Sequence, residues 1–330
     1  MKKILVLFLS FVVLLASSCS FLPSSLRDTP SVLQPEEIDI DVDEDDDSDR
    51  DDEASDETTD ITDKSKEESE ESTKPTACEI TETTSPEGVQ TYGDVTLRFA
   101  EESKTAQADD TSFTIYEGTI RRVEVEIASN PEAEVRINEN LAAYHDEAEL
   151  YREETIEGAV LMYEEIGEES FHAPFTSNAY IGTDYISDSL ICFGVMYDMY
   201  YGGAHGGSVA ATYTFDLNTG ALVTIDDICT DPDAFRESIF TAMIDQIQSL
   251  PEENNPYFEG YEEAVPEAFS RAAWSLSDSC VITFFTVTFQ EYDLAPYAAG
   301  KPKFAIPLED LKPFFNEYGL SLFDWEEIES

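Results

Sequence analysis

The first regular pattern of the chain is an alternation of apolar and polar residues. Val95 to Phe99 and Val123 to Ile127 both place apolar side chains at every second position. This period of two is typical of strands with one buried face. A further strand is expected over residues 178–183.

Between these strands the period changes to that of a helix. Asn130 and Pro131 are suited to the N-cap and first helical position. Apolar positions then follow at spacings of four and three along one helical face: Ile137, Leu141, Tyr144, Ala148 and Tyr151. The pattern predicts a helix from Pro131 to about Ile166, with Gly158 as a weak point.

The second half begins with a run of large apolar residues from Leu190 to Tyr201, typical of a strand buried on both faces. Residues 212–217 alternate, and the Asn218-Thr219-Gly220 turn predicts a hairpin with a return strand over 222–225.

Helices and strands then follow one another. Asp231-Pro232 predicts a helix start, and a second helical stretch covers Tyr257 to Trp274, with a new helix beginning at Pro266. Strands are expected over 280–289 and 304–306, before a terminal helix over 308–318 that is broken by Pro313. The expected class is α+β, an antiparallel sheet with helices packed on it, in two subdomains, 91–183 and 184–330.

An acidic segment precedes the folded part. The 330 residues include 72 acidic and 18 basic ones, a net charge of -54. Residues 36–71 alone contain 21 acidic and three basic side chains. Such a segment buries too little apolar surface to offset its ordering entropy. We therefore expect residues 19–90 to form a disordered acidic linker.

The N-terminus has the features of an export signal. Two lysines precede a 12-residue apolar run, Ile4 to Leu15, which is shorter than the roughly 20 residues of a membrane-spanning helix. Ala16-Ser17-Ser18-Cys19 follows and resembles a bacterial lipobox. The sequence predicts a signal peptide over 1–18 and diacylglycerol on Cys19, which anchors the protein to the outer face of the cell membrane. An ordinary secretory signal is the alternative.

Catalytic and metal-binding motifs are missing from the sequence. HExxH, G-x-S-x-G, Walker and Rossmann patterns are all absent, so we expect no catalytic residues, metal or cofactor. The spacing of Cys192, Cys229 and Cys280 matches no disulfide framework. A Cys192–Cys280 bridge and buried free thiols both remain open.

Two loops are candidates for recognition. The first contains Tyr201, Gly202, Gly203, His205 and Gly206, and the second contains Tyr292, Pro296, Tyr297 and Gly300. Glycines allow close approach of a ligand, and tyrosines bury large areas at low entropic cost. A tight turn and a packed connection are the structural alternatives. We expect the two loops to meet at one edge, with Tyr292 and Tyr297 as aromatic anchors and His205 as a polar contact or brace.

These segments resemble a known family. Tyr201 to Gly206, Tyr213 to Gly220, Asp226 to Ile228, and Phe289 to Pro307 are similar to the RsiV/PdaC-like extracytoplasmic domain family. That C-terminal ectodomain is shared by a lysozyme-sensing anti-sigma factor and a cell-wall deacetylase. The resemblance implies a non-catalytic binding ectodomain for a lysozyme-like protein.

Charge narrows the choice of partner. Residues 74–330 contain 50 acidic and 12 basic side chains, a net charge of -38. Nucleic acid is excluded as a partner, because phosphate binding needs a cationic surface. A basic extracellular protein is favoured, and peptidoglycan bound through exposed aromatic residues is the alternative.

Overall fold

The computed structural model describes residues 78–108, 112–279 and 282–328, all within one compact unit. The expected signal peptide, Cys19 and Cys280 lie outside the described residues.

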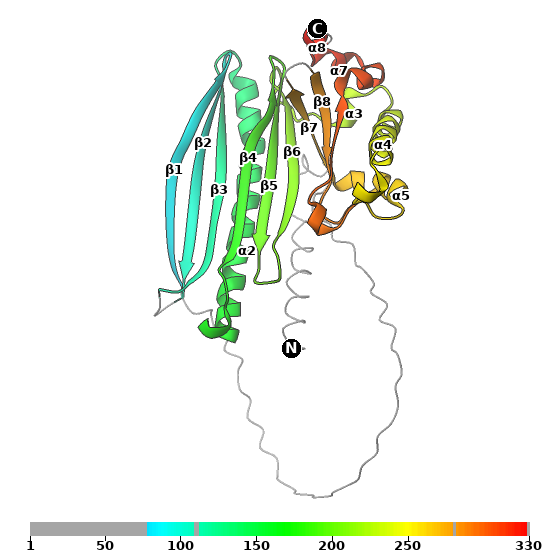
Figure 1. Ribbon diagram of the computed structural model, residues 1–330. Helices are drawn as coiled ribbons and strands as arrows, with labels where there is room; N and C mark the ends of the chain where they lie inside the picture. Colours follow the sequence, from blue (N-terminus) through cyan, green and yellow to red (C-terminus); the bar gives the residue numbers. More distant parts are fainter. Residues whose placement is uncertain (1–77, 109–111, 280–281, 329–330) are drawn as a thin grey trace, which may run out of the picture. The chain divides into compact units, whose positions relative to one another are not determined.

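Six strands form one sheet in chain order (Figure 1). They are β1 (Glu79–Tyr92), β2 (Val95–Gln107), β3 (Thr114–Ile127), β4 (Phe175–Ile186), β5 (Leu190–Tyr200) and β6 (Gly207–Asp216). Neighbours are antiparallel except β3 and β4, which are parallel. The α+β class is confirmed, but this sheet is mixed, because a helix connects β3 to β4 as parallel strands require.

That connecting helix is α2 (Pro131–Ile166), and it lies along one face of the sheet (Figure 1). Asn130 is its N-cap and accepts a hydrogen bond from the Ala133 N–H, as the sequence predicts. Gly158 causes no break in the helix. The buried face includes Ile137, Leu141 and Tyr144, which pack on β2, β3 and β5 side chains.

A second, antiparallel sheet contains β7 (Ala273–Ser279), β8 (Ile282–Thr288) and β9 (Lys303–Pro307). The helices of this part are α3 (Ile225–Ile228), α4 (Pro232–Gln248), α5 (Tyr261–Ala268), α6 (Leu308–Leu311), α7 (Glu317–Ser321) and α8 (Trp325–Ile328). Short 3-10 turns lie at Glu168–Ser170, Glu252–Asn254, Phe269–Arg271, Tyr297–Ala299 and Lys312–Phe314.

Strand β5 contributes to two cores, which explains its continuous apolar run. Ile191, Phe193 and Val195 pack in the cluster under α2. Leu190 and Cys192 point to the other face and pack in the cluster formed by α4 and the second sheet. The strand is next to the sheet edge rather than central, and it is buried because both of its faces are covered. The division expected at residues 183 and 184 lies inside β4.

The start of the fold differs from the sequence expectation. Strand β1 begins at Glu79 and pairs with β2, so residues 79–90 belong to the sheet rather than to the expected linker. Most β1 side chains are exposed, including Ile80 and Val89. The segment therefore lacks the buried alternation by which a strand is recognised.

Three local predictions in the second half need correction. The segment after the predicted turn does pair with β6, through an antiparallel bridge between Leu222 and Phe215, but it is not a full strand, and Ile225 starts α3. Thr224 and Asp227 form a capping box, which stabilises that helix start. Pro266 lies inside α5 rather than starting a helix, and residues 273 and 274 begin strand β7.

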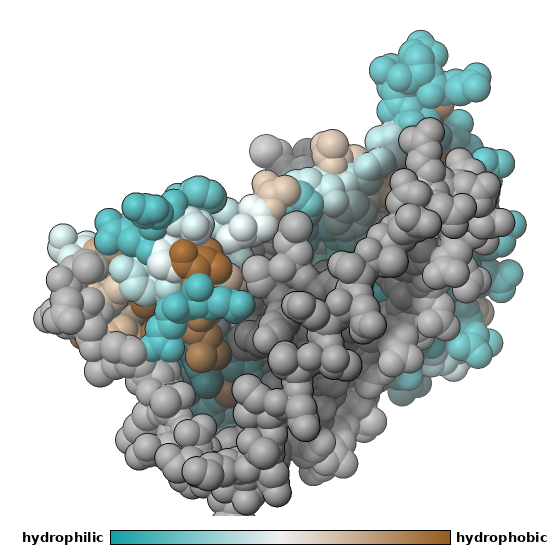
Figure 2. Space-filling view, turned by 90° about the horizontal axis from the view of Figure 1, so that it is seen from below, coloured by the Kyte–Doolittle hydropathy of each residue, from teal (hydrophilic) through white to brown (hydrophobic). Residues whose placement is uncertain are grey.

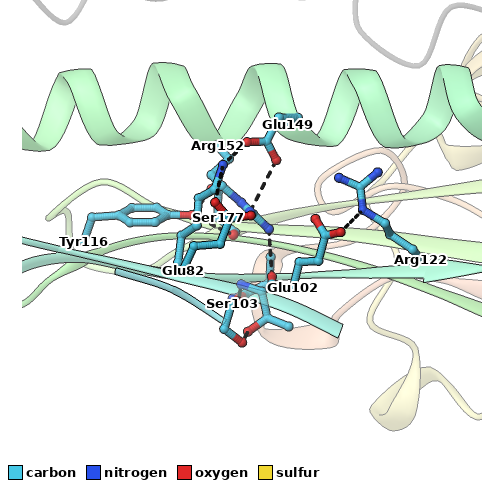
Figure 3. A network of polar contacts seen from close by, with 11 residues as sticks. Glu82, Glu102, Ser103, Tyr116, Arg122, Glu149, Arg152 and Ser177 are labelled. Atoms are coloured by element: carbon cyan, nitrogen blue, oxygen red, sulfur yellow. Dashed lines mark hydrogen bonds and ion pairs between the residues drawn. The ribbon is translucent and has the colours of Figure 1, made fainter. Parts of the chain in front are cut away.

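A buried polar layer crosses the interface between α2 and the sheet (Figure 3). Arg152 is fully buried, donates a 2.8 Å hydrogen bond to the Glu102 carbonyl and lies 3.3 Å from Glu149. Beside it, the hydroxyl oxygens of Tyr116 and Ser177 are 3.0 Å apart. Apolar clusters pack on either side of this layer. Polar partners thus fix the position of α2 on the sheet.

Candidate functional site

The two candidate loops meet in the structure. The His205 ring stacks on Tyr297 with 4.1 Å between ring centroids and an interplanar angle of 24°. Tyr292 also stacks on Tyr297, with 5.9 Å between ring centroids and an interplanar angle of 29°. We call these three side chains the aromatic row. More than 80 residues separate its two loops in the chain, and the juxtaposition agrees with the sequence expectation.

The glycine turn connects β5 to β6 and holds His205 in place. Gly202 has φ +83°, and a Cβ there would lie 3.1 Å from the Phe175 ring. A Cβ on Gly206 would lie 2.6 Å from the Met199 carbonyl oxygen, so both positions favour glycine. His205 Nδ1 donates a 2.7 Å hydrogen bond to the Gly206 carbonyl, a contact within the turn itself.

Two other candidates in this turn lie apart from the aromatic row. Tyr201 packs edge-on against Phe175, 5.9 Å between centroids, in an apolar cluster with the last turns of α2. Its pKa is raised by burial. Gly203 is exposed, and its carbonyl accepts a hydrogen bond from the Tyr200 hydroxyl.

Gln290 attaches the second loop to the free edge of β6. Its side-chain oxygen accepts a 2.9 Å hydrogen bond from the Ala210 N–H, and its Nε2 donates to the Ala210 carbonyl at 2.9 Å. The same Nε2 also donates to the Arg271 carbonyl at 2.9 Å. The side-chain amide thus forms the pair of bonds that a neighbouring strand would form.

Two carboxylates complete this attachment. Glu291 accepts hydrogen bonds from Ser208 Oγ at 2.8 Å and from Lys301 Nζ at 3.0 Å. Burial opposes its ionisation, but those hydrogen bonds and the Lys301 charge lower the Glu291 pKa overall. Asp293 accepts from the Gln290 N–H at 2.8 Å and pairs with Arg271 at 3.0 Å.

The rest of the loop separates buried from exposed residues. Leu294 and Ala295 are fully buried, whereas Pro296 is exposed and Tyr292 is 55% exposed. Tyr292 has φ +68° and is the one non-glycine residue with positive φ in the described part of the chain. Such a conformation costs about 1 kcal/mol or more and persists where the surroundings impose it. Gly300 also has positive φ, +71°, and ends the turn that carries Tyr297.

The described cysteines of the second half are buried. Cys192 is a free thiol that accepts a 3.3 Å hydrogen bond from Thr214, and burial raises its pKa to about 12. Cys229 is also a free thiol. The open question of a bridge from Cys192 concerns Cys280, which lies outside the described residues.

Sequence reasoning missed the role of Gln290 and the environment of Glu147. Gln290 lies within the segment that carries the family resemblance, but a single glutamine gives no sign of which backbone it pairs with. Glu147 lies near Tyr197 and Tyr213, and this grouping depends on how α2 crosses the sheet.

No group of three or more His, Cys, Asp or Glu side chains suited to a metal is found among the described residues. In that same part of the chain, no helix has both the length and the apolar character needed to cross a bilayer.

Comparisons with known proteins identify a domain and a fold. A DUF3298 family protein from Bacteroides fragilis is 16% identical, with a TM-score of 0.50, and covers 74% of this chain and 96% of its own. A DUF3298 family protein from Pseudomonas aeruginosa PAO1 is 11% identical, with a TM-score of 0.36, and the match again covers 74% of this chain and 96% of that protein. No curated protein matches the sequence. Residues 226–309 match the family model "Protein of unknown function (DUF3298)", so this chain contains a DUF3298 domain.

Proposed function

We propose that this protein is a bacterial lipoprotein, anchored outside the cell through Cys19, whose folded part binds an extracellular basic protein such as a lysozyme-like hydrolase. The proposal includes the finer resemblance to the RsiV/PdaC-like ectodomain. It assigns binding rather than catalysis to the two loops.

The aromatic row is the observation that carries this proposal. Its side chains come from two loops attached to strands, so their positions are set before a partner arrives. Preorganised tyrosines lose little entropy on binding and are enriched among the residues that dominate interface energies. Pro296, which is exposed and precedes Tyr297 in the chain, extends the same surface.

The carboxylates nearest to the row support a binding role. Glu291 is engaged by Ser208 and Lys301, and Asp293 is engaged by Arg271. These contacts hold the loop on β6. The polar groups therefore act as supports for the aromatic row.

Charge supports a basic partner. Residues 78–328 contain 11 basic side chains, and eight of them form ion pairs within the described structure. Most acidic side chains therefore have no internal counter-charge, and the described surface visible in Figure 2 is mostly hydrophilic. Such a surface attracts a cationic protein and raises its association rate.

The test is a titration of the full chain with soluble lysozyme, comparing wild type with Tyr297→Ala. A hot-spot tyrosine contributes about 1–3 kcal/mol, so the variant should bind about 5-fold to 150-fold more weakly. Tyr92→Ala is the matched control, because Tyr92 is an exposed tyrosine on β1, outside both loops. Added salt should slow association of all three proteins. If Tyr297→Ala and Tyr92→Ala are both folded and bind lysozyme with equal affinity, the assignment of the binding site to the aromatic row is refuted.

Peptidoglycan is a second candidate ligand, favoured by the stacked pair Tyr292 and Tyr297. Neutral sugar rings pack on exposed aromatic rings without needing a charge. Co-sedimentation with insoluble peptidoglycan would detect this binding. Glycan binding should be insensitive to salt, whereas binding of a basic protein should weaken as salt is added.

A further inference from the structure

A hollow lined by tyrosines lies between α2 and strands β5 and β6. It is small and partly open to solvent, and its lining includes Glu147, Tyr151, Tyr197, Met199, Val209 and Tyr213. Ser208 and Ala210 contact the second candidate loop, whereas Val209 and Ala211 line the hollow. Because side chains alternate along a strand, the Ser208 side chain, which contacts Glu291, and the hollow are on opposite faces of β6, and the Gln290 amide is bound at the edge of that strand.

Glu147 is a carboxylate with no cationic partner in the described structure. The hydroxyl of Tyr197 lies 3.4 Å from its Oε2 and donates to it. None of the ion pairs of the described residues includes Glu147. Burial raises the pKa of Glu147, although hydrogen bonds from Tyr197 and Tyr151 oppose that shift. A partly buried carboxylate without a counter-ion is unfavourable, and a cation beside it would relieve the cost.

The aromatic walls favour the same kind of ligand. Tyr151 and Tyr197 are 5.9 Å apart between centroids and nearly perpendicular, at 67°. Tyrosine faces carry partial negative charge and attract cations. A planar guanidinium combines stacking on a ring with paired hydrogen bonds to a carboxylate, and an ammonium lacks this planar match.

We propose that this hollow binds an arginine side chain of a basic partner protein, with the guanidinium against Glu147 and beside the tyrosine rings that line the hollow. The site goes beyond the proposed function, because it is separate from the aromatic row and does not depend on the identity of the partner. The single uncompensated carboxylate and the strongly acidic surface provide the charge complementarity.

The test uses butylguanidinium chloride as the probe and the full chain labelled with ¹³C-methyl methionine. Met199 lines the hollow, whereas Met243 is fully buried in the other core, so Met243 reports whether the fold is intact. A saturable shift of the Met199 methyl resonance is expected. Glu147→Gln should lower the affinity for the probe at least tenfold, and Tyr151→Leu should lower it severalfold. Glu153→Gln, an exposed glutamate of the same helix, should leave the affinity unchanged.

Several outcomes would overturn the proposal. These are no saturable shift at Met199, an affinity within twofold of wild type in Glu147→Gln, or equal binding of neutral butylurea. Butylammonium binding as tightly as butylguanidinium would overturn the assignment to arginine. Tyr297→Ala should not change probe binding, so failure of this site and failure of the aromatic row are distinguishable.

Discussion

Replacement of Gln290 by alanine tests how the second candidate loop is held. The substitution removes three hydrogen bonds, two with the Ala210 backbone and one with the Arg271 carbonyl. Each is worth about 1 kcal/mol net when the groups are partly buried. Gln290→Ala should therefore lower the free energy of unfolding by about 3 kcal/mol, which urea denaturation measures from the midpoint at constant slope.

Gln246→Ala is the matched control for this variant. Gln246 is a half-buried glutamine that donates one hydrogen bond to the Ala305 carbonyl, at 3.1 Å. Its loss should cost about 1 kcal/mol or less. Hydrogen exchange should also show faster exchange of the Ala210 amide in Gln290→Ala. If the two variants lose the same stability, the loop is held by Leu294 and Ala295 packing, and the reasoning about amide pairing is refuted.

Three other predictions concern separate parts of the chain. Because burial raises the folded-state pKa of Glu147, its ionised form destabilises the fold as pH rises. Glu147→Gln should raise the melting temperature at pH 7.5, and the gain should vanish below about pH 4.3, where the unfolded glutamate is also protonated. Gly220 has φ +70°, and a Cβ there would lie 2.5 Å from the Ala133 carbonyl oxygen. Gly220→Ala should therefore cost more than about 1 kcal/mol in urea denaturation, and a smaller cost would show that the turn rearranges freely. Cys19→Ala should release the protein from the membrane or leave an uncleaved precursor, and normal processing with membrane retention in cell fractionation would contradict the lipobox.

The sequence predicted the elements whose residues have a clear local pattern. Asn130 and Asp231, each followed by proline, start α2 and α4 as expected. The apolar period along α4 also matches its buried face, from Phe235 to Ile247. These patterns are visible locally because capping and helical packing act over a few neighbouring residues.

Elements that depend on distant partners were missed or misassigned. Strand β1 is exposed, so only its pairing with β2 makes it a strand. Trp274 continues the apolar pattern of a helix, but it pairs with Val287 in the second sheet. Tertiary pairing of this kind overrides local propensity.

The candidate site was partly predictable for the same reason. Aromatic and glycine-rich loops mark His205 and Tyr297 as unusual, and the family pattern brings both loops into one hypothesis. The sequence did not show that Tyr201 packs inward on Phe175, because adjacent tyrosines look alike until the strand assigns their faces. The partner of Gln290 depends on the docking of two segments 80 residues apart.

The amide of Gln290 also affects how copies of this protein behave when they are crowded together. An edge strand with free N–H and C=O groups is a template for intermolecular sheet formation and aggregation. At one edge of the sheet, the Ala210 groups are already occupied by a side chain. At the other edge, β1 has an irregular register at Pro86 and carboxylates at Glu82 and Glu87, features that discourage strand addition. Both edges of the sheet thus carry features that discourage strand addition between copies.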